Sequence, residues 1–168
     1  KKDAQDVLIE KASELGIAGF YPVITDHTDV RTLHADRITA QMIEAAEQCE
    51  RMDIPTLAPL RPLMTCLAEI KGRGVILAAI ERSLASPLYK VCEDLPRAAE
   101  IFILVGPAGG FSASEKEKLG AHENIIPVSL GDRILRAETA AITMLSVLQY
   151  GDKWRARGPA SSHTLAGW

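Results

Sequence analysis

Hydrophobic residues recur along the chain with a helical period in three segments. Between residues 3 and 15 apolar side chains are three or four apart, which predicts an amphipathic helix that ends at Gly16. The same spacing returns over 36–52, where polar residues occupy the other positions. It returns again over 137–149, where the predicted helix is largely apolar. We therefore predict three long helices, two of them in the first third of the chain.

Short apolar runs lie between these helices. The runs GVILAAI at 74–80 and IFILV at 101–105 are typical of strands buried on both faces, as in a parallel sheet covered by helices. Further strands are predicted over 17–25, where Pro22 favours a strand start or a sheet edge, and over 125–130.

Two shorter helices are predicted among the strands. The spacing over 88–95 is weakly helical, and Ser112 with Glu115 forms a capping box for a helix over 112–119. This alternation favours an α/β fold with a mostly parallel sheet flanked by helices. One domain is predicted over 1–151, and residues 152–168, which lack periodicity, are expected to form a flexible tail.

Composition and charge narrow the classes of function. The 168 residues are 47% hydrophobic and 24% charged, as in a globular domain with one core. No apolar run approaches the ~20 residues of a membrane helix, so we expect a cytoplasmic protein without membrane contact. The net charge of -3 gives no general attraction to nucleic acid, and the scattered cysteines and histidines favour neither a disulfide framework nor a metal site.

Two segments carry candidate chemistry. Residues 105–111, VGPAGGF, join a buried strand to the capped helix, where open α/β sheets bind ligands; a tight turn without a ligand is the alternative. Residues 128–141, VSLGDRILRAETAA, bring two arginines and a glutamate to the start of an apolar helix. Helix capping and surface ion pairing would also explain that charge density.

Together the two segments resemble the signature loops of the SPOUT-class ribosomal RNA small subunit methyltransferase E family. The pattern S-L-G-x-R-I-L-R-x-E-T-A at 129–140 is long and specific. Upstream, K-A-S-E-L-G at 11–16 and E-A-A-E-Q-C-E-R at 44–51 also match the family, so the resemblance covers nearly the whole chain.

The resemblance implies a C-terminal deep trefoil knot, a rare exception to unknotted topology, and S-adenosylmethionine-dependent methylation of uridine N3 in small-subunit (16S) ribosomal RNA. It also implies a homodimer formed through the knot region and helix 137–149. The family's N-terminal PUA-like RNA-binding domain is absent, and since the chain begins at Lys1, we expect a fragment. The cofactor-binding positions that match the family are Leu77, Val105, Gly106, Gly110, Leu130, Gly131, Leu135 and Thr139.

The charged residues are assigned by chemistry within this resemblance. Arg136 is expected to stabilise developing negative charge or hold a phosphate, and Glu138 to orient it or accept the proton of N3. Arg51 and Arg133 are candidates for contacts to RNA phosphates, with structural ion pairs as the alternative. Ala108 departs from the glutamate common in the family's glycine loop, so the loop has lost a charge.

Two other functions stay open at this point. The first is a catalytically weak knotted module that docks on ribosomal RNA. The second is a different α/β enzyme that uses the glycine loop for a phosphorylated ligand.

Overall fold

A parallel β-sheet organises the chain. The structure, a computed structural model, describes residues 2–29, 32–80, 85–95, 100–150 and 162–167. The strands are β1 (Gly19–Ile24), β2 (Thr56–Leu57), β3 (Arg61–Pro62), β4 (Gly74–Ala79), β5 (Ser86–Pro87), β6 (Glu100–Val105), β7 (Ile125–Ser129) and β8 (Ser162–Gly167). Their order is β2-β1-β8-β6-β4-β7-β5, with β3 also paired to β1, and each of these pairings is parallel.

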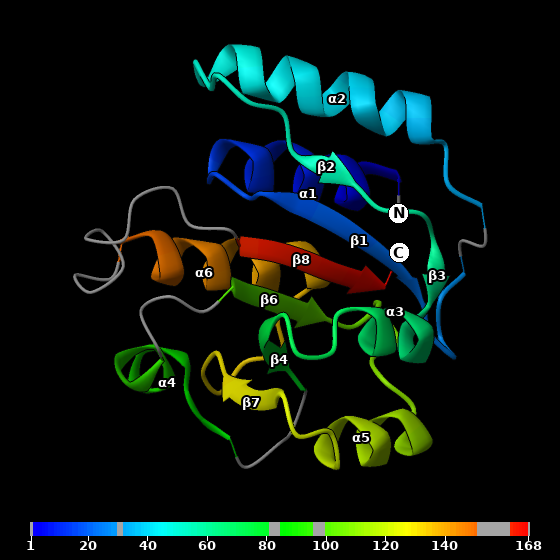
Figure 1. Ribbon diagram of the computed structural model, residues 1–168, viewed down its shortest axis with the longest axis vertical. Helices are drawn as coiled ribbons and strands as arrows, with labels where there is room; N and C mark the ends of the chain where they lie inside the picture. The colour runs from blue at the N-terminus through cyan, green and yellow to red at the C-terminus, as the bar shows by residue number, and fades with distance from the viewer. Residues whose placement is uncertain (1, 30–31, 81–84, 96–99, 151–161, 168) are drawn as a thin grey trace.

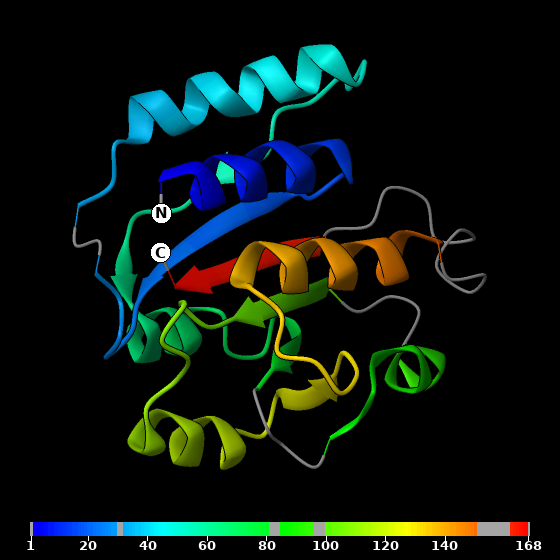
Figure 2. The same ribbon diagram turned by 180° about the vertical axis from the view of Figure 1, so that it is seen from behind.

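Six helices of the described part of the chain cover this sheet. They are α1 (Lys2–Glu14), α2 (Ala35–Gln48), α3 (Leu63–Glu69), α4 (Leu88–Asp94), α5 (Ala113–Gly120) and α6 (Ala137–Tyr150). α1 and α6 lie side by side on one face, with α2 packed outside α1, while α3 lies on the opposite face (Figures 1 and 2).

The central strands are buried on both faces. Along β6, Ile101, Ile103 and Val105 pack into the core beneath α1, α2 and α6. Phe102 and Leu104, the alternate residues, pack into a second core with side chains of α3 and α5. Continuous burial explains why this strand reads as an uninterrupted apolar run, and it confirms the predicted α/β fold with a parallel sheet.

The boundaries differ from the prediction most clearly at α2. This helix ends at Gln48, not at residue 52, because the backbone at Glu50 takes a positive φ of 57° that no helix can continue. Met52 is consequently fully exposed and does not extend the buried face of the helix.

Pro22 lies within a paired strand, not at a sheet edge. β2 pairs with β1 up to Phe20, and β3 pairs with it again from Val23. Pro22 therefore falls at the break between β2 and β3, where its missing N–H costs no ladder hydrogen bond on that side.

The predicted flexible tail is wrong for residues 162–167. These residues form β8, which lies between β1 and β6 in the middle of the sheet, and all six are buried (Figure 1). Residues 152–161 lie outside the described part of the chain. The sequence SHTLAG has little apolar periodicity, and its assignment depends on pairing with strands more than 50 residues away, which no local pattern reveals.

β8 buries an unusual number of polar side chains for a central strand. Three of its atoms, Ser162 Oγ, His163 Nδ1 and Thr164 Oγ1, are buried without a hydrogen-bond partner. His163 Nε2 lies 2.7 Å from Glu100 Oε1, and Arg73 donates to the same carboxylate from 2.8 Å. β8 is thus stabilised by backbone pairing with β1 and β6 and by the contacts among His163, Glu100 and Arg73, more than by burial of apolar side chains of its own.

We expect Thr164→Val to stabilise the domain. Valine keeps the branched shape, whereas the buried hydroxyl of Thr164, 1% exposed, lacks a partner and lost its water on folding. The gain should be about 1 kcal/mol in the free energy of unfolding, measured by urea denaturation. An unchanged or lower midpoint would show that the hydroxyl is satisfied.

His163 should make stability depend on pH. Burial lowers the pKa of this imidazole, and the opposing effect of Glu100 is smaller. The unfolded chain therefore takes up a proton first as the pH falls below about 6.5, and stability is lost there, with a slope of at most about 1.4 kcal/mol per pH unit. Comparison with His163→Gln in urea denaturation checks this, since the glutamine variant should show a shallower decline between neutral and mildly acidic pH.

Candidate functional site

A large cleft opens at the carboxyl ends of the parallel strands. Its walls come from the segments that follow β1, β4, β6 and β7, from Gly167 at the end of β8 and from the first turns of α1. Its volume, near 2890 Å³, is several times the ~300–1,000 Å³ of a pocket for one small ligand. The cleft therefore has room for a cofactor together with part of a larger substrate.

The glycine loop, residues 106–110, forms one wall. The N–H of Gly110 donates to the carbonyl of Pro107 at 2.8 Å, and Gly110 has a φ of 69° that favours glycine. A Cβ on Gly106 would lie 3.1 Å from the ring of the buried Phe111. The loop consequently presents backbone to the cleft, with little room for added side chains.

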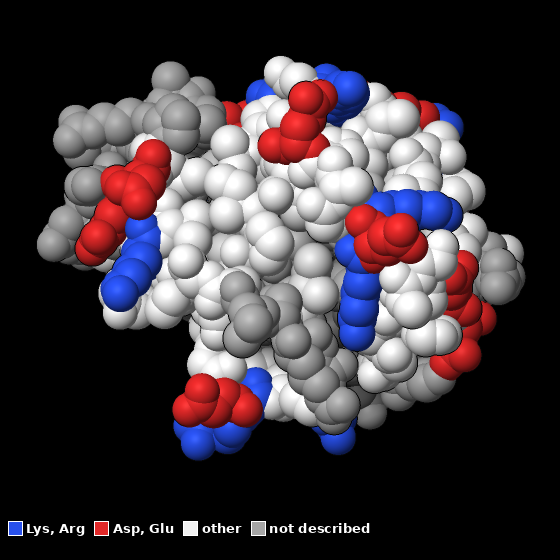
Figure 3. Space-filling view, turned by 90° about the horizontal axis from the view of Figure 1, so that it is seen from below, with Lys and Arg blue, Asp and Glu red and all other residues white. Residues whose placement is uncertain are grey.

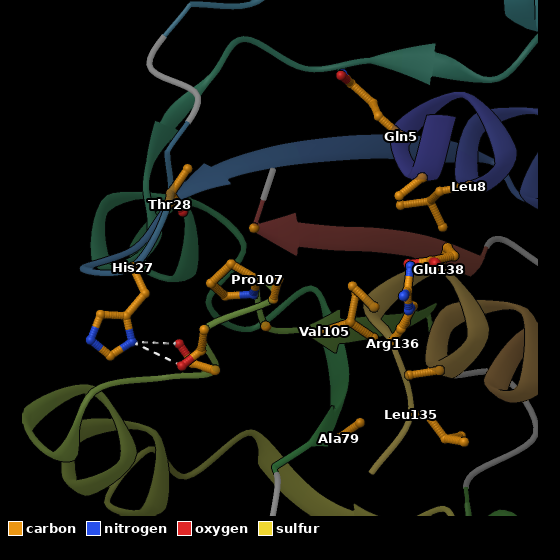
Figure 4. Close-up of a pocket in the computed structure, with 18 of the residues that line it drawn as sticks. Gln5, Leu8, His27, Thr28, Ala79, Val105, Pro107, Leu135, Arg136 and Glu138 are labelled. Atoms are coloured by element: carbon orange, nitrogen blue, oxygen red, sulfur yellow. Dashed lines mark hydrogen bonds between the residues drawn. The ribbon is translucent and has the colours of Figure 1, made fainter. Parts of the chain in front are cut away.

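The second loop, residues 129–136, forms the opposite wall. Gly131 has a φ of 105°, and the carbonyl of Arg136 accepts the first backbone hydrogen bond of α6 from Ala140 at 2.8 Å. Arg136 and Glu138 lie side by side near Leu8 of α1, across Val105 from the glycine loop (Figure 4). The start of α6 thus brings a cation and a carboxylate together in the cleft.

The segment that follows β1 forms a third wall that the sequence did not indicate. Asp26, His27 and Thr28 line the cleft, and His27 contacts the glycine loop (Figure 4). A polar run, T-D-H-T, directly after a buried strand was the available signal, because ligand sites of parallel sheets collect at strand ends.

Most of the predicted cofactor positions meet in this cleft. Val105, Gly106 and Gly110 line it from the first loop, and Leu130, Gly131 and Leu135 from the second. The predicted catalytic pair and Arg133 line it as well. Residues 105–110 and 130–138 are thus brought together by the adjacent carboxyl ends of β6, β4 and β7.

Two predicted cofactor positions do not line the cleft. Leu77 is fully buried in the middle of β4, and the cleft is lined instead by Ala79 and Ile80 near the end of that strand. Thr139 is exposed on the first turn of α6, where its carbonyl accepts the hydroxyl of Thr143 at 2.8 Å. Their role in cofactor binding stays a prediction.

Arg51 lies outside the cleft, in the structural ion pair that was the alternative to an RNA contact. Its guanidinium donates to the carbonyl of Ser13 at 2.7 Å and to the carboxylate of Asp53 at 2.8 Å. The pKa of the Asp53 carboxyl is lowered, first of all by its hydrogen bond from Arg51. A contact between Arg51 and RNA phosphates stays a prediction.

Surface charge and cysteine chemistry add little to the site. On the face shown in Figure 3, acidic and basic side chains stand in small mixed groups around a largely uncharged centre.

Burial raises the pKa of the Cys66 thiol to about 11, as expected for an unreactive cysteine. Within the described ranges there is no group of three potential metal ligands and no helix long and apolar enough to cross a membrane.

Comparisons with known proteins agree with this geometry. The RNA methyltransferase domain family matches residues 1–149. The ribosomal RNA small subunit methyltransferase E of Rickettsia conorii is 35% identical over 147 residues, which cover 87% of this chain and 59% of that protein. The chain therefore spans less than two thirds of this relative.

Two solved structures have the same fold. The ribosomal RNA small subunit methyltransferase E of Neisseria gonorrhoeae, bound to S-adenosyl methionine, is 28% identical, with a TM-score of 0.74 over 88% of this chain and 60% of that one. A putative methyltransferase of Legionella pneumophila, in complex with the cofactor SAM, is 31% identical, with a TM-score of 0.72 over 87% of this chain and 60% of that one. The predicted resemblance is confirmed, and the chain belongs to the RNA methyltransferase domain family.

Proposed function

We propose that the chain is the catalytic domain of an S-adenosylmethionine-dependent methyltransferase that modifies uridine N3 in small-subunit (16S) ribosomal RNA. The observation that carries the proposal is the meeting of the glycine loop, residues 106–110, and the second loop, residues 129–136, in one cleft at the carboxyl ends of the strands. The solved relative from Neisseria gonorrhoeae, which binds S-adenosyl methionine, supports the cofactor.

The residues present fit this cofactor. Backbone of the glycine loop and the apolar side chains Val105, Leu130 and Leu135 line the cleft, and they suit a ligand with an adenine ring and an amino-acid chain. When bound, the cofactor supplies an activated methyl group on a sulfonium sulfur. Gly106 and Gly110 would let backbone groups approach it closely.

Two charged residues would serve the RNA side of the reaction. Uracil N3 carries a proton at neutral pH, and the loss of this proton before N3 attacks the methyl carbon places negative charge on the base. Arg136 would stabilise that charge or hold a neighbouring phosphate, and Glu138 would orient Arg136 or take the proton. Arg133, exposed on the same loop, would contact phosphate.

The assembly expected of the family extends the proposal. The trefoil knot would be formed by the second loop and α6, and a homodimer would be formed through the same region. An N-terminal RNA-binding domain would supply most of the affinity for a cytoplasmic ribosomal substrate, consistent with the net charge of -3 of this chain. Ala108, exposed in the cleft, leaves the glycine loop without the family's usual carboxylate.

The alternative of a phosphorylated ligand is disfavoured at α5. A phosphate would bind the free N–H groups at the start of this helix, but the hydroxyl of Ser112 and the carboxylate of Glu115 already accept N–H groups there. Asp26 adds a second negative charge, since its carboxylate contacts Ser112. The other alternative, a module that docks on ribosomal RNA, makes no use of the cofactor. The following experiment distinguishes it from the proposed methyltransferase.

Methyl transfer to defined RNA tests the proposed function. The chain, extended by the N-terminal domain of a relative, would be incubated with S-adenosylmethionine and unmethylated small-subunit ribosomal RNA or subunits. Digestion to nucleosides and mass spectrometry should reveal N3-methyluridine. A folded protein that binds the ribosomal RNA but leaves every nucleoside unmodified would favour the docking module instead.

A further inference from the structure

His27 is attached to the glycine loop by its ring. The Nδ1 atom lies 3.1 Å from the carbonyl oxygen of Gly109 and 3.0 Å from that of Gly110 (Figure 4). Carbonyl oxygens only accept hydrogen bonds, so Nδ1 must carry the hydrogen. The contact therefore fixes the tautomer of His27, with Nε2 as the acceptor of the neutral ring.

The segment that carries His27 is itself held firmly. The backbone N–H of Thr25 donates to Thr28 Oγ1 at 2.9 Å, and the two hydroxyl oxygens are 2.8 Å apart. Both threonines are buried, so these bonds close a turn with Asp26 and His27 at its tip. The imidazole thus extends from a short, supported turn.

One buried carboxylate joins this turn to the glycine loop a second time. Glu115, 6% exposed, accepts the N–H of Asp26 at 3.0 Å and the N–H of Ser112 at 2.9 Å. The first donor belongs to the segment after β1, and the second is the N-cap of α5, two residues after the glycine loop. The two segments therefore share a fixed base, and His27 adds a contact near the top of the loop.

Gly109 is adapted to this contact. A Cβ at position 109 would lie 3.0 Å from the Cβ of His27 and 3.4 Å from its Cγ, closer than side chains normally pack. A larger residue at position 109 would require His27 to move away from the loop by a few tenths of an ångström. Its neighbour Gly110, with a φ of 69°, aims its carbonyl at the same nitrogen.

We propose that His27 is a positioning residue for the cofactor site: its Nδ1–H holds the carbonyls of Gly109 and Gly110 and so keeps the glycine loop in its binding conformation. The inference deepens the proposed function and rests on it. Because the loop is ordered before binding, less conformational entropy is lost when the ligand binds. Losing the donor should weaken S-adenosylmethionine binding about tenfold, the effect of one hydrogen bond in such a site.

Calorimetric titration with S-adenosylmethionine tests the inference on His27→Ala and His27→Gln. The alanine variant should bind about tenfold more weakly, and the glutamine variant, whose amide can donate to the same carbonyls, should recover most of the affinity. His122→Ala is the control, because His122 lies outside the cleft and should leave the affinity unchanged. Since His27 is exposed, its variants should unfold at the wild-type temperature, which separates positioning from a structural role.

Nitrogen NMR of the imidazole gives a readout that does not need the cofactor. In alkaline solution the His27 ring should show hydrogen on Nδ1, and an Nε2–H tautomer would overturn the inference. Equal affinity of wild type and His27→Ala would overturn it as well, while leaving the proposed function intact. A wild-type chain that shows the Nδ1–H tautomer but binds no S-adenosylmethionine would instead overturn the proposed function.

Discussion

A chain cut before Ser162 should fail to fold cooperatively. β8 pairs with β1 on one side and with β6 on the other, so its removal leaves one edge of each of these two inner strands unpaired and splits the sheet in two. Each lost backbone hydrogen bond costs about 1 kcal/mol, and the whole stability of a domain is about 5–15 kcal/mol. Burial of Leu165, 0% exposed, and Ala166, 2% exposed, is lost in addition.

Thermal unfolding followed by near-ultraviolet circular dichroism measures this effect. The truncated chain should show no sigmoidal transition and should expose apolar surface to a fluorescent dye. Leu165→Ala is the graded control, and it should keep the transition while losing about 2–5 kcal/mol of stability. A truncated chain that unfolds at the wild-type temperature would mean that β8 adds nothing to the sheet.

Replacement of Arg136 by alanine should lower turnover by about 100-fold or more, the usual loss when one donor to developing negative charge is removed. The residue is exposed at the start of α6, so neither the fold nor the affinity for S-adenosylmethionine should change by much. Steady-state methyl transfer to small-subunit ribosomal RNA, with both substrates varied, separates kcat from KM.

Arg133→Ala is the matched control for this experiment. Both arginines are exposed, lie on the second loop and line the cleft, but Arg133 is expected to contact phosphate only. Its loss should raise the KM for RNA and make RNA binding less dependent on salt concentration, while kcat stays near the wild-type value. Wild-type turnover in both Arg136→Ala and Glu138→Ala would contradict the assignment of these two residues.

The core of the fold could be predicted because its signals are local. The apolar runs that became β4 and β6 and the capping box of α5 are each contained within a few residues. β8 could not be predicted, because its polar residues are buried only through pairing with β1 and β6. A strand stabilised by distant partners leaves little trace in its own sequence.

The site shows the same division. Gly106, Gly110 and Arg136 line the cleft, and they were predicted because they lie in two motifs that resemble the family's signature loops. His27 was missed because a single histidine carries no pattern, and its significance depends on two carbonyl oxygens more than 80 residues later. Leu77 was assigned by resemblance, and the structure shows that the cleft begins two residues further along β4, at Ala79.

Titration of the chain with S-adenosylmethionine is the most direct test of the central claim, that the cleft between the two loops binds this cofactor. We expect saturable binding at one site, and loss of that binding in Gly106→Val, whose side chain would meet Phe111 and distort the loop. Circular dichroism should show that this variant is folded. A folded wild-type chain that releases no heat and binds no S-adenosylmethionine would contradict the claim.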